Sequence, residues 1–262
     1  MNIAVLIGAI LMGLSLGLLG SGGSILTVPV LVYLAGEPEK QAIAESLIIV
    51  AMVAAVGAWC NMRKQNTDIA LALRFGIPSM FAAVAGAWAS QFVSGAVQLL
   101  VFSIVMLTAA IFMLRGSKKE EVGQDTSAPG ASALKGIISG SGVGAMAGFV
   151  GVGGGFLIVP VLLNVMKIRL SMAVGTSLMI ICMQSVAAAL KYQHQFAAVD
   201  VTINWPLVLV VGGVAILGVL AGGKLGQSLP QAAIKKGFAF LLLAIGLFTA
   251  VDAGMSFLRT MA

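Results

Sequence analysis

The chain is poor in charged and aromatic residues. Only 9% of its 262 residues are Asp, Glu, Lys or Arg and 6% are Phe, Trp or Tyr, whereas 60% are hydrophobic. A soluble domain of this size needs far more polar surface, so this composition excludes one. Several apolar runs reach the length of about 20 residues that spans a bilayer as a helix. The sequence therefore predicts an all-α polytopic membrane protein.

Residues that carry metal or redox chemistry are scarce. The chain has one histidine, His194, and two cysteines, Cys60 and Cys182, which form no CxxC pair. Neither a disulfide framework nor a zinc site can be built from these residues, and no cofactor is predicted. The sequence also lacks a Walker-type motif, an acid–base pair within the spans and a long basic block. We therefore expect no enzyme activity, no ATP hydrolysis and no nucleic-acid partner.

Glycine, by contrast, is abundant, with 33 residues. The fifteen-residue stretch Gly17–Leu31 recurs 131 residues later as Gly148–Leu162, with nine identical positions. Each copy places a glycine cluster before a proline, and neither residue type continues a straight helix. Such a stretch inside an apolar span predicts a helix that breaks within the membrane. Paired breaks in two halves of a chain are the best sequence indicator of a transporter's binding site.

The duplication extends beyond these breaks. Ser46-Leu47 matches Ser177-Leu178 at the same spacing, and the small residues of 82–90 match those of 218–226 at a slightly longer spacing. We interpret residues 1–115 and 135–262 as two transmembrane repeats joined by a polar loop, 116–134. Each repeat is predicted to contain a broken segment and three spans. The broken segments are 3–35 and 135–166, and the spans are 42–62, 70–92, 95–114, 171–192, 203–226 and 232–257.

The distribution of basic residues favours inverted repeats. If each broken segment crosses the membrane once, nine basic residues lie on one side and six on the other. If each broken segment is re-entrant, the repeats are inverted, and twelve of the fifteen basic residues share one side. The positive-inside rule favours this second arrangement. The three exceptions are Lys40, Lys191 and Arg259.

The breaks predict an anion site without a buried basic side chain. A helix that restarts near Ser24 leaves its first amides without intrahelical partners, and these amides favour an anion. Two serines of the first break are candidate donors and caps, whereas the second break depends on glycine amides. The alternative is that the glycines only permit a kink. The candidate residues are Ser21, Gly22, Gly23 and Ser24 in the first break, and Gly153, Gly154 and Gly155 in the second.

The duplicated Gly-x-x-Gly-x-Gly-Gly-(Gly/Ser)-x-Leu-x-Val-Pro motif, with Gly175-Thr176-Ser177-Leu178 downstream, resembles the TauE/SafE family of membrane permeases. The resemblance covers essentially the entire chain. It implies a transporter of sulfur-containing anions such as sulfite, thiosulfate or an organosulfonate, in a bacterial inner membrane. The first repeat departs from the downstream motif, because it reads Ala44-Glu45-Ser46-Leu47.

Polar residues at the starts of the next spans are further candidates. Glu45 is a candidate proton carrier, although a glutamate in a first helix turn is also favourable by itself. The hydroxyls of Ser46, Thr176 and Ser177 either line the pathway or bond to backbone carbonyls. The amide of Gln184 either meets the substrate or a neighbouring helix.

The sequence thus predicts a secondary transporter of a small anion, with the lipid bilayer as its other partner. An anion channel and a membrane-embedded sulfur-relay component or enzyme are the alternatives. Homo-oligomer formation stays open at this point.

Overall fold

The computed structural model describes residues 3–20, 22–115, 129–164, 168–197, 202–225 and 231–261. These residues form helices and no strands. The first half contains α1 (Ile3–Leu19), α2 (Ser24–Pro29), the π-helix η1 (Val30–Ala35), α3 (Glu39–Arg63), α4 (Ile69–Ala89), the 3₁₀ turn η2 (Ser90–Phe92) and α5 (Gly95–Arg115). The second half contains α6 (Pro129–Val150), α7 (Gly155–Asn164), α8 (Leu170–Ala197), α9 (Trp205–Leu225) and α10 (Gln231–Met261).

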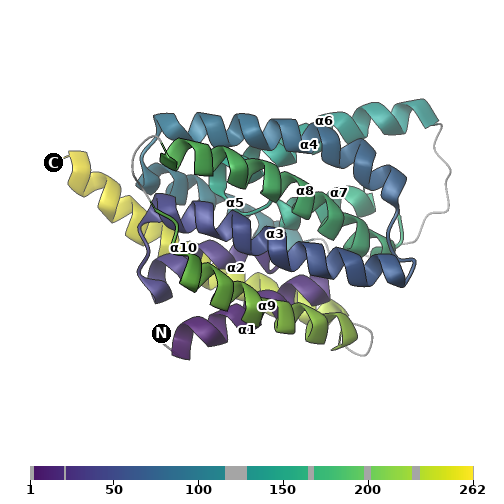
Figure 1. Cartoon of the computed structure of the whole chain (residues 1–262), viewed down its shortest axis with the longest axis horizontal. Coiled ribbons are helices and arrows are strands. Elements are labelled where there is room, and N and C mark those ends of the chain that lie inside the picture. The colour runs from purple at the N-terminus through teal and green to yellow at the C-terminus, as the bar shows by residue number, and fades with distance from the viewer. Residues whose placement is uncertain are drawn as a thin grey trace.

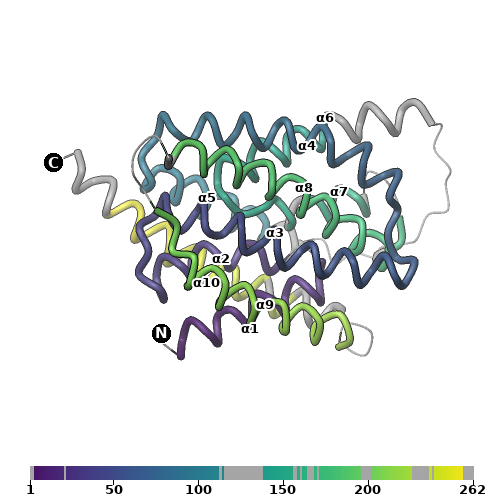
Figure 2. The backbone as a smooth tube through the Cα atoms, in the orientation of Figure 1, coloured from purple at the N-terminus to yellow at the C-terminus, as the bar shows by residue number. Residues whose placement is uncertain are grey.

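The long helices form a layered bundle whose contacts run in the order α6, α4, α8, α3, α9, α1 (Figures 1 and 2). α3 and α8 lie side by side at the centre, and α5 packs against α10. Each of these contacts joins a helix of the first half of the chain to a helix of the second. The helices of residues 3–115 are therefore interleaved with those of residues 129–261, and the two halves of the chain share one core.

Four helices are long and apolar enough to cross a membrane: Glu39–Arg63, Ile69–Phe92, Ser171–Gln195 and Trp205–Leu225. They coincide with four of the six predicted spans. The remaining two predicted spans correspond to α5 and α10, which are also helical. The number, length and apolar character of these helices are therefore those of a multi-pass membrane protein. Residues 129–134 of the predicted polar loop begin α6 instead, with Pro129 at the first helical position, where its missing N–H costs nothing.

Small residues allow the outer helices to approach closely. A methyl group added to Gly13 or Gly17 of α1 would collide with the backbone of α9 at Ala215 or Val219. Added to Gly148 of α6, it would collide with the backbone of α4. Small residues thus lie at the α1–α9 and α4–α6 contacts, where they permit tight helix packing.

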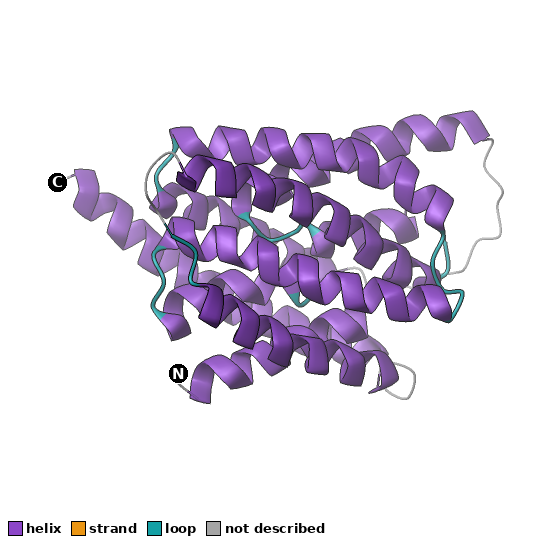
Figure 3. Ribbon diagram, viewed as in Figure 1, coloured by secondary structure: helices purple, strands orange, loops and turns teal. Residues whose placement is uncertain are grey.

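Two loops lie in the interior of the bundle, between α1 and α2 and between α6 and α7 (Figure 3). After the first loop the chain folds back along α1, since Gly8 lies against Val30 and Leu34. The chain consequently returns to the end of the bundle at which α3 begins, which we call end A. The opposite end, at which α3 finishes with Arg63, is end B.

Candidate functional site

The first interior loop, residues 20–23, is the first break. α1 ends with Gly20 in the left-handed region, at a φ of 70°, and its N–H donates to the Leu16 carbonyl at 2.8 Å. Gly23 precedes α2 and has no side-chain cap, so Ser24 is the first helical residue and the predicted cap by Ser24 is wrong. Ser21 lies outside the described residues.

Two amides that were expected to be open to an anion are bonded within the first break. Ile25 N–H donates to the Gly22 carbonyl at 3.4 Å, and Leu26 N–H donates to the Gly23 carbonyl at 3.1 Å. These bonds form a tight turn at the start of α2. The other polar side chains of this region belong to Ser24 and Thr27, and both are buried.

The second interior loop, residues 151–154, is the second break and contains three left-handed glycines. Gly151, Gly153 and Gly154 have φ angles of 79°, 65° and 59°. A side chain at any of these positions would be strained, which explains why the stretch is so rich in glycine. Gly155 then begins α7.

A serine from the other half of the chain bonds to each break. The Ser46 hydroxyl lies 2.5 Å from the Gly151 carbonyl, and the Ser177 hydroxyl lies 2.9 Å from the Gly20 carbonyl. The two serines occupy equivalent positions of the repeats, as do the two glycines. We call this pair of hydrogen bonds the crossed serine contacts. Each hydroxyl also lies within hydrogen-bond distance of a carbonyl in its own helix, as one of the two predicted alternatives requires.

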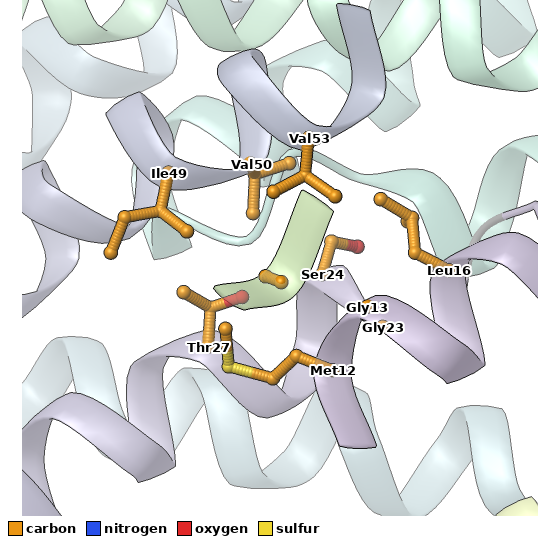
Figure 4. A pocket seen from close by; sticks show the side chains of 10 residues that line it. Met12, Gly13, Leu16, Gly23, Ser24, Thr27, Ile49, Val50 and Val53 are labelled. Carbon is orange, nitrogen blue, oxygen red and sulfur yellow. The ribbon is translucent and has the colours of Figure 1, made fainter. Parts of the chain in front are cut away.

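A small cavity lies beside the first break, level with the middle of α3 (Figure 4). Its volume is about 10 Å³, which is enough for a single water molecule. Ser24 and Thr27 contribute hydroxyl groups, and the rest of the lining is apolar or glycine. The other lining residues are Met12, Gly13, Leu16, Gly23, Ile49, Val50, Val53 and Ala215.

Gln184 lies at the second break, with both ends of its amide engaged. Nε2 donates to the Gly153 carbonyl, and Oε1 accepts a hydrogen bond from the Ser79 hydroxyl at 2.5 Å. Both side chains are fully buried. Gln184 thus joins α8 to α4 and to the second break.

Glu45 and Thr176, which are equivalent in the repeats, face loops and not the breaks. Glu45 Oε1 accepts a hydrogen bond from the Asn204 backbone N–H at 2.8 Å and another from Gln41 at 3.0 Å. Thr176 Oγ1 accepts one from the Asp68 backbone N–H at 3.0 Å. Each side chain therefore anchors the loop that leads into α9 or α4.

Three buried polar residues near the second break were not among the predicted site residues. Ser79 bonds to Gln184, and Ser185 has a buried hydroxyl without a hydrogen-bond partner, close to Gly153. Gln98 donates to the Phe149 carbonyl at 2.7 Å, just before this break. Only their position within apolar helices could have indicated them, because a polar residue in a span generally faces protein.

No group of three His, Cys, Asp or Glu side chains that could hold a metal ion occurs among the described residues. The groups gathered at the two breaks are neutral: glycine backbone, hydroxyls and the amides of Gln184 and Gln98. Together with the apolar helices, this arrangement is that of a multi-pass membrane protein whose helices break around a small interior space, as in membrane transporters.

Comparisons with known proteins agree with this class. Residues 5–249 match the family model described as sulfite exporter TauE/SafE, and the chain belongs to this family of membrane transporters. A probable membrane transporter protein of Xylella fastidiosa (strain Temecula1) is 29% identical over 244 residues, which cover 91% of this chain and 90% of the relative. One from Bacillus subtilis is 24% identical, with 81% and 82% covered, and one from Methanocaldococcus jannaschii is 26% identical, with 70% of each covered. No solved structure matches.

Proposed function

We propose that the protein is a secondary transporter that moves a small sulfur-containing anion, such as sulfite, thiosulfate or an organosulfonate. The anion would bind near the middle of the membrane, between the two breaks. The sulfur chemistry follows the description of the family, and the location follows the geometry of the breaks.

One observation carries this proposal: the two breaks approach each other at the centre of the bundle. The helices that follow them, α2 and α7, are in contact. Val50 of α3 lines the cavity beside the first break, and a methyl group on Gly153 would lie 2.9 Å from its Cγ1 atom. Interrupted helices inside a membrane protein are tolerated where they are buried in protein or line a cavity, and transporters use such places to bind substrate.

The same proposal includes an inverted arrangement of the repeats. α1 begins at end A and the chain returns there after the first break, whereas α6 begins at end B and α7 leads back to it (Figure 1). Arg63, Arg169 and Lys224 all lie near end B, which we assign to the cytoplasm by the positive-inside rule.

This orientation can be tested with single cysteines in a background in which Cys60 and Cys182 are replaced by serine. Ile3→Cys and Pro38→Cys should react with an impermeant maleimide from outside the cell, and Lys64→Cys should react only after the membrane is opened. All three residues are exposed in the structure. Reaction of Ile3→Cys and Pro38→Cys from opposite sides would show that the first broken segment crosses the membrane.

Glu45 is our candidate for the group that couples proton movement to transport. Among the described residues it is the only fully buried acidic side chain, and its Oε2 atom has no hydrogen-bond partner. The neutral Thr176 makes the equivalent loop contact, so that contact does not require a carboxyl group. Buried ionisable groups in transporters commonly serve proton relays.

The coupling test uses Glu45→Gln, which keeps an oxygen acceptor for Asn204. We expect a proton gradient to stimulate transport by the parent protein and to leave the variant unaffected. Thr176→Val is the matched control and should retain the response. A variant that responds like its parent, or a parent that ignores the gradient, contradicts the role of Glu45.

Substrate class can be tested by thermal unfolding of the purified protein in detergent, with sulfite, thiosulfate, sulfoacetate and taurine as probes. Sulfate and chloride serve as controls. A ligand present at 100 times its dissociation constant stabilises the folded state by about 2.7 kcal/mol, which shifts the midpoint measurably. We expect stabilisation by at least one sulfur-containing probe and by neither control. Failure of all the sulfur-containing probes would overturn the proposed substrate class.

A further inference from the structure

The side chains beside the first break differ in polarity from those at the equivalent positions beside the second break. Val53 and Ala215 line the cavity at the first break. Their equivalents in the duplicated sequence are Gln184 and Ser79, which are hydrogen-bonded to each other, and Gln184 also holds the Gly153 carbonyl. Two aliphatic side chains beside the first break thus correspond to a hydrogen-bonded polar pair beside the second, and each pair takes one residue from each half of the chain.

We propose that the cavity beside the first break is the anion-binding subsite, and that the Gln184–Ser79 pair fills the equivalent position beside the second. This inference rests on the proposed function and makes it more specific, because it assigns substrate binding to one break. In this arrangement Gln184 is a fixed structural group and not a substrate ligand.

The side chains on the other wall support the same assignment. Ser24 and Thr27 bring hydroxyl groups to the cavity, as Figure 4 shows, whereas their equivalents are Gly155 and Ile158. The first break therefore offers two hydroxyl side chains around an unfilled space. At the second break Gly155 and Ile158 offer none, Gln184 and Ser79 bond to each other, and the remaining hydroxyl is that of Ser185. Hydroxyls suit an oxyanion that must be released again, since they bind it without a fixed opposite charge.

The cavity must widen for this role, because at about 10 Å³ it holds one water and no sulfur oxyanion. Its walls belong to separate elements: α1 and α2 on one side, α3 and α9 on the other. A displacement of the α1–α2 hairpin relative to α3 would enlarge it. In this proposal the present cavity is the contracted form of the subsite.

A reciprocal exchange of the two fillings tests the proposal. The double variant Val53→Gln/Ala215→Ser copies the polar pair to the cavity beside the first break and should weaken binding of sulfite and thiosulfate at least about tenfold, as expected for a filled site. The opposite variant, Gln184→Val/Ser79→Ala, should keep both dissociation constants within about threefold of the parent values, even where its thermal midpoint falls. Binding is measured by calorimetry on the folded fraction of each protein.

A smaller change guards against variants that fail to fold. Thr27→Val removes one hydroxyl at constant shape and should weaken binding about tenfold, whereas the equivalent Ile158→Val should not change it. Loss of binding in Gln184→Val/Ser79→Ala, with normal binding in Thr27→Val, would overturn the assignment and move the subsite to the second break. A parent protein that binds neither sulfite nor thiosulfate would instead overturn the proposed function.

Discussion

The two glycine breaks begin alike and then diverge. In both, a left-handed glycine ends the incoming helix and its carbonyl accepts a hydrogen bond from a serine of the other repeat. Beyond this point the first break continues with Gly23 at a φ of −67°, whereas Gly153 and Gly154 remain left-handed in the second. The duplicated sequence thus specifies a common way of ending a helix, but the path that follows depends on local packing.

This comparison also separates two kinds of residue. Groups that hold the backbone together occur in both halves, as the crossed serine contacts do. Groups that fill the space occur beside only one of the two breaks, as Gln184 and Ser79 do. We therefore expect matched variants of the first kind to have equal effects, and matched variants of the second kind to have unequal ones.

The largest effects are expected where glycines bring helices into contact. Gly17→Ala and Gly148→Ala each place a methyl group against the backbone of a neighbouring helix, at α9 or α4. Overpacking of this kind costs about 1–3 kcal/mol, so both variants should unfold at clearly lower temperature in detergent. Gly213→Ala is the control, because nothing lies within 4 Å of the added atom. If Gly17→Ala and Gly148→Ala are as stable as Gly213→Ala, the close packing of these helices is incorrect.

The crossed serine contacts should have a smaller effect that is equal in the two halves. Ser46→Ala and Ser177→Ala each remove a buried donor from a break carbonyl and should cost about 1.5 kcal/mol, the upper end of the net contribution of a hydrogen bond. The thermal midpoints of the two single variants provide the measurement. Ser103→Ala is a useful comparison, since this buried hydroxyl bonds only to the Leu100 carbonyl of its own helix at 2.7 Å. A large effect of only one break serine would show that the contacts are not equivalent.

The smallest effects are expected at the helix starts. Asp68 Oδ1 accepts the Leu71 N–H at 2.9 Å at the start of α4, and Asn204 Oδ1 accepts the Leu207 N–H at 3.3 Å before α9. Loss of such a cap costs about 1 kcal/mol. Asn204 Nδ2 also donates to Glu37 Oε1 at 2.8 Å, so Asn204→Ala removes an exposed hydrogen bond besides its longer cap bond. Asp68→Ala and Asn204→Ala should therefore each destabilise by about 1 kcal/mol in the same unfolding measurement. No effect of Asp68→Ala would contradict its role as a cap.

Much of the helical architecture could be predicted from the sequence, because it depends on local properties. Apolar length specifies the spans, and the spacing of small residues specifies which helix faces pack closely. The partners of those faces could not be predicted. The contacts of α1 with α9 and of α4 with α6 join the two halves of the chain, and nothing in the sequence of either half indicates these partners.

The site was predicted less completely for the same reason. Glycine clusters indicated where the helices break, but the partners of Ser46, Ser177 and Gln184 lie far away in the sequence. Ser24 was wrongly predicted as a cap, because Gly23 can precede the helix without any side-chain bond. Ser79 of α4 bonds to Gln184 of α8, and no local sequence pattern links these two residues.

Counterflow in proteoliposomes tests the central claim most directly. Vesicles that contain the purified protein are loaded with unlabelled sulfite or thiosulfate, and the entry of the same anion, labelled with radioactive sulfur, is followed. A transporter with an occluded subsite between its breaks predicts saturable, transient accumulation of the label above its external concentration. Conductance without exchange would contradict a carrier and identify an anion channel.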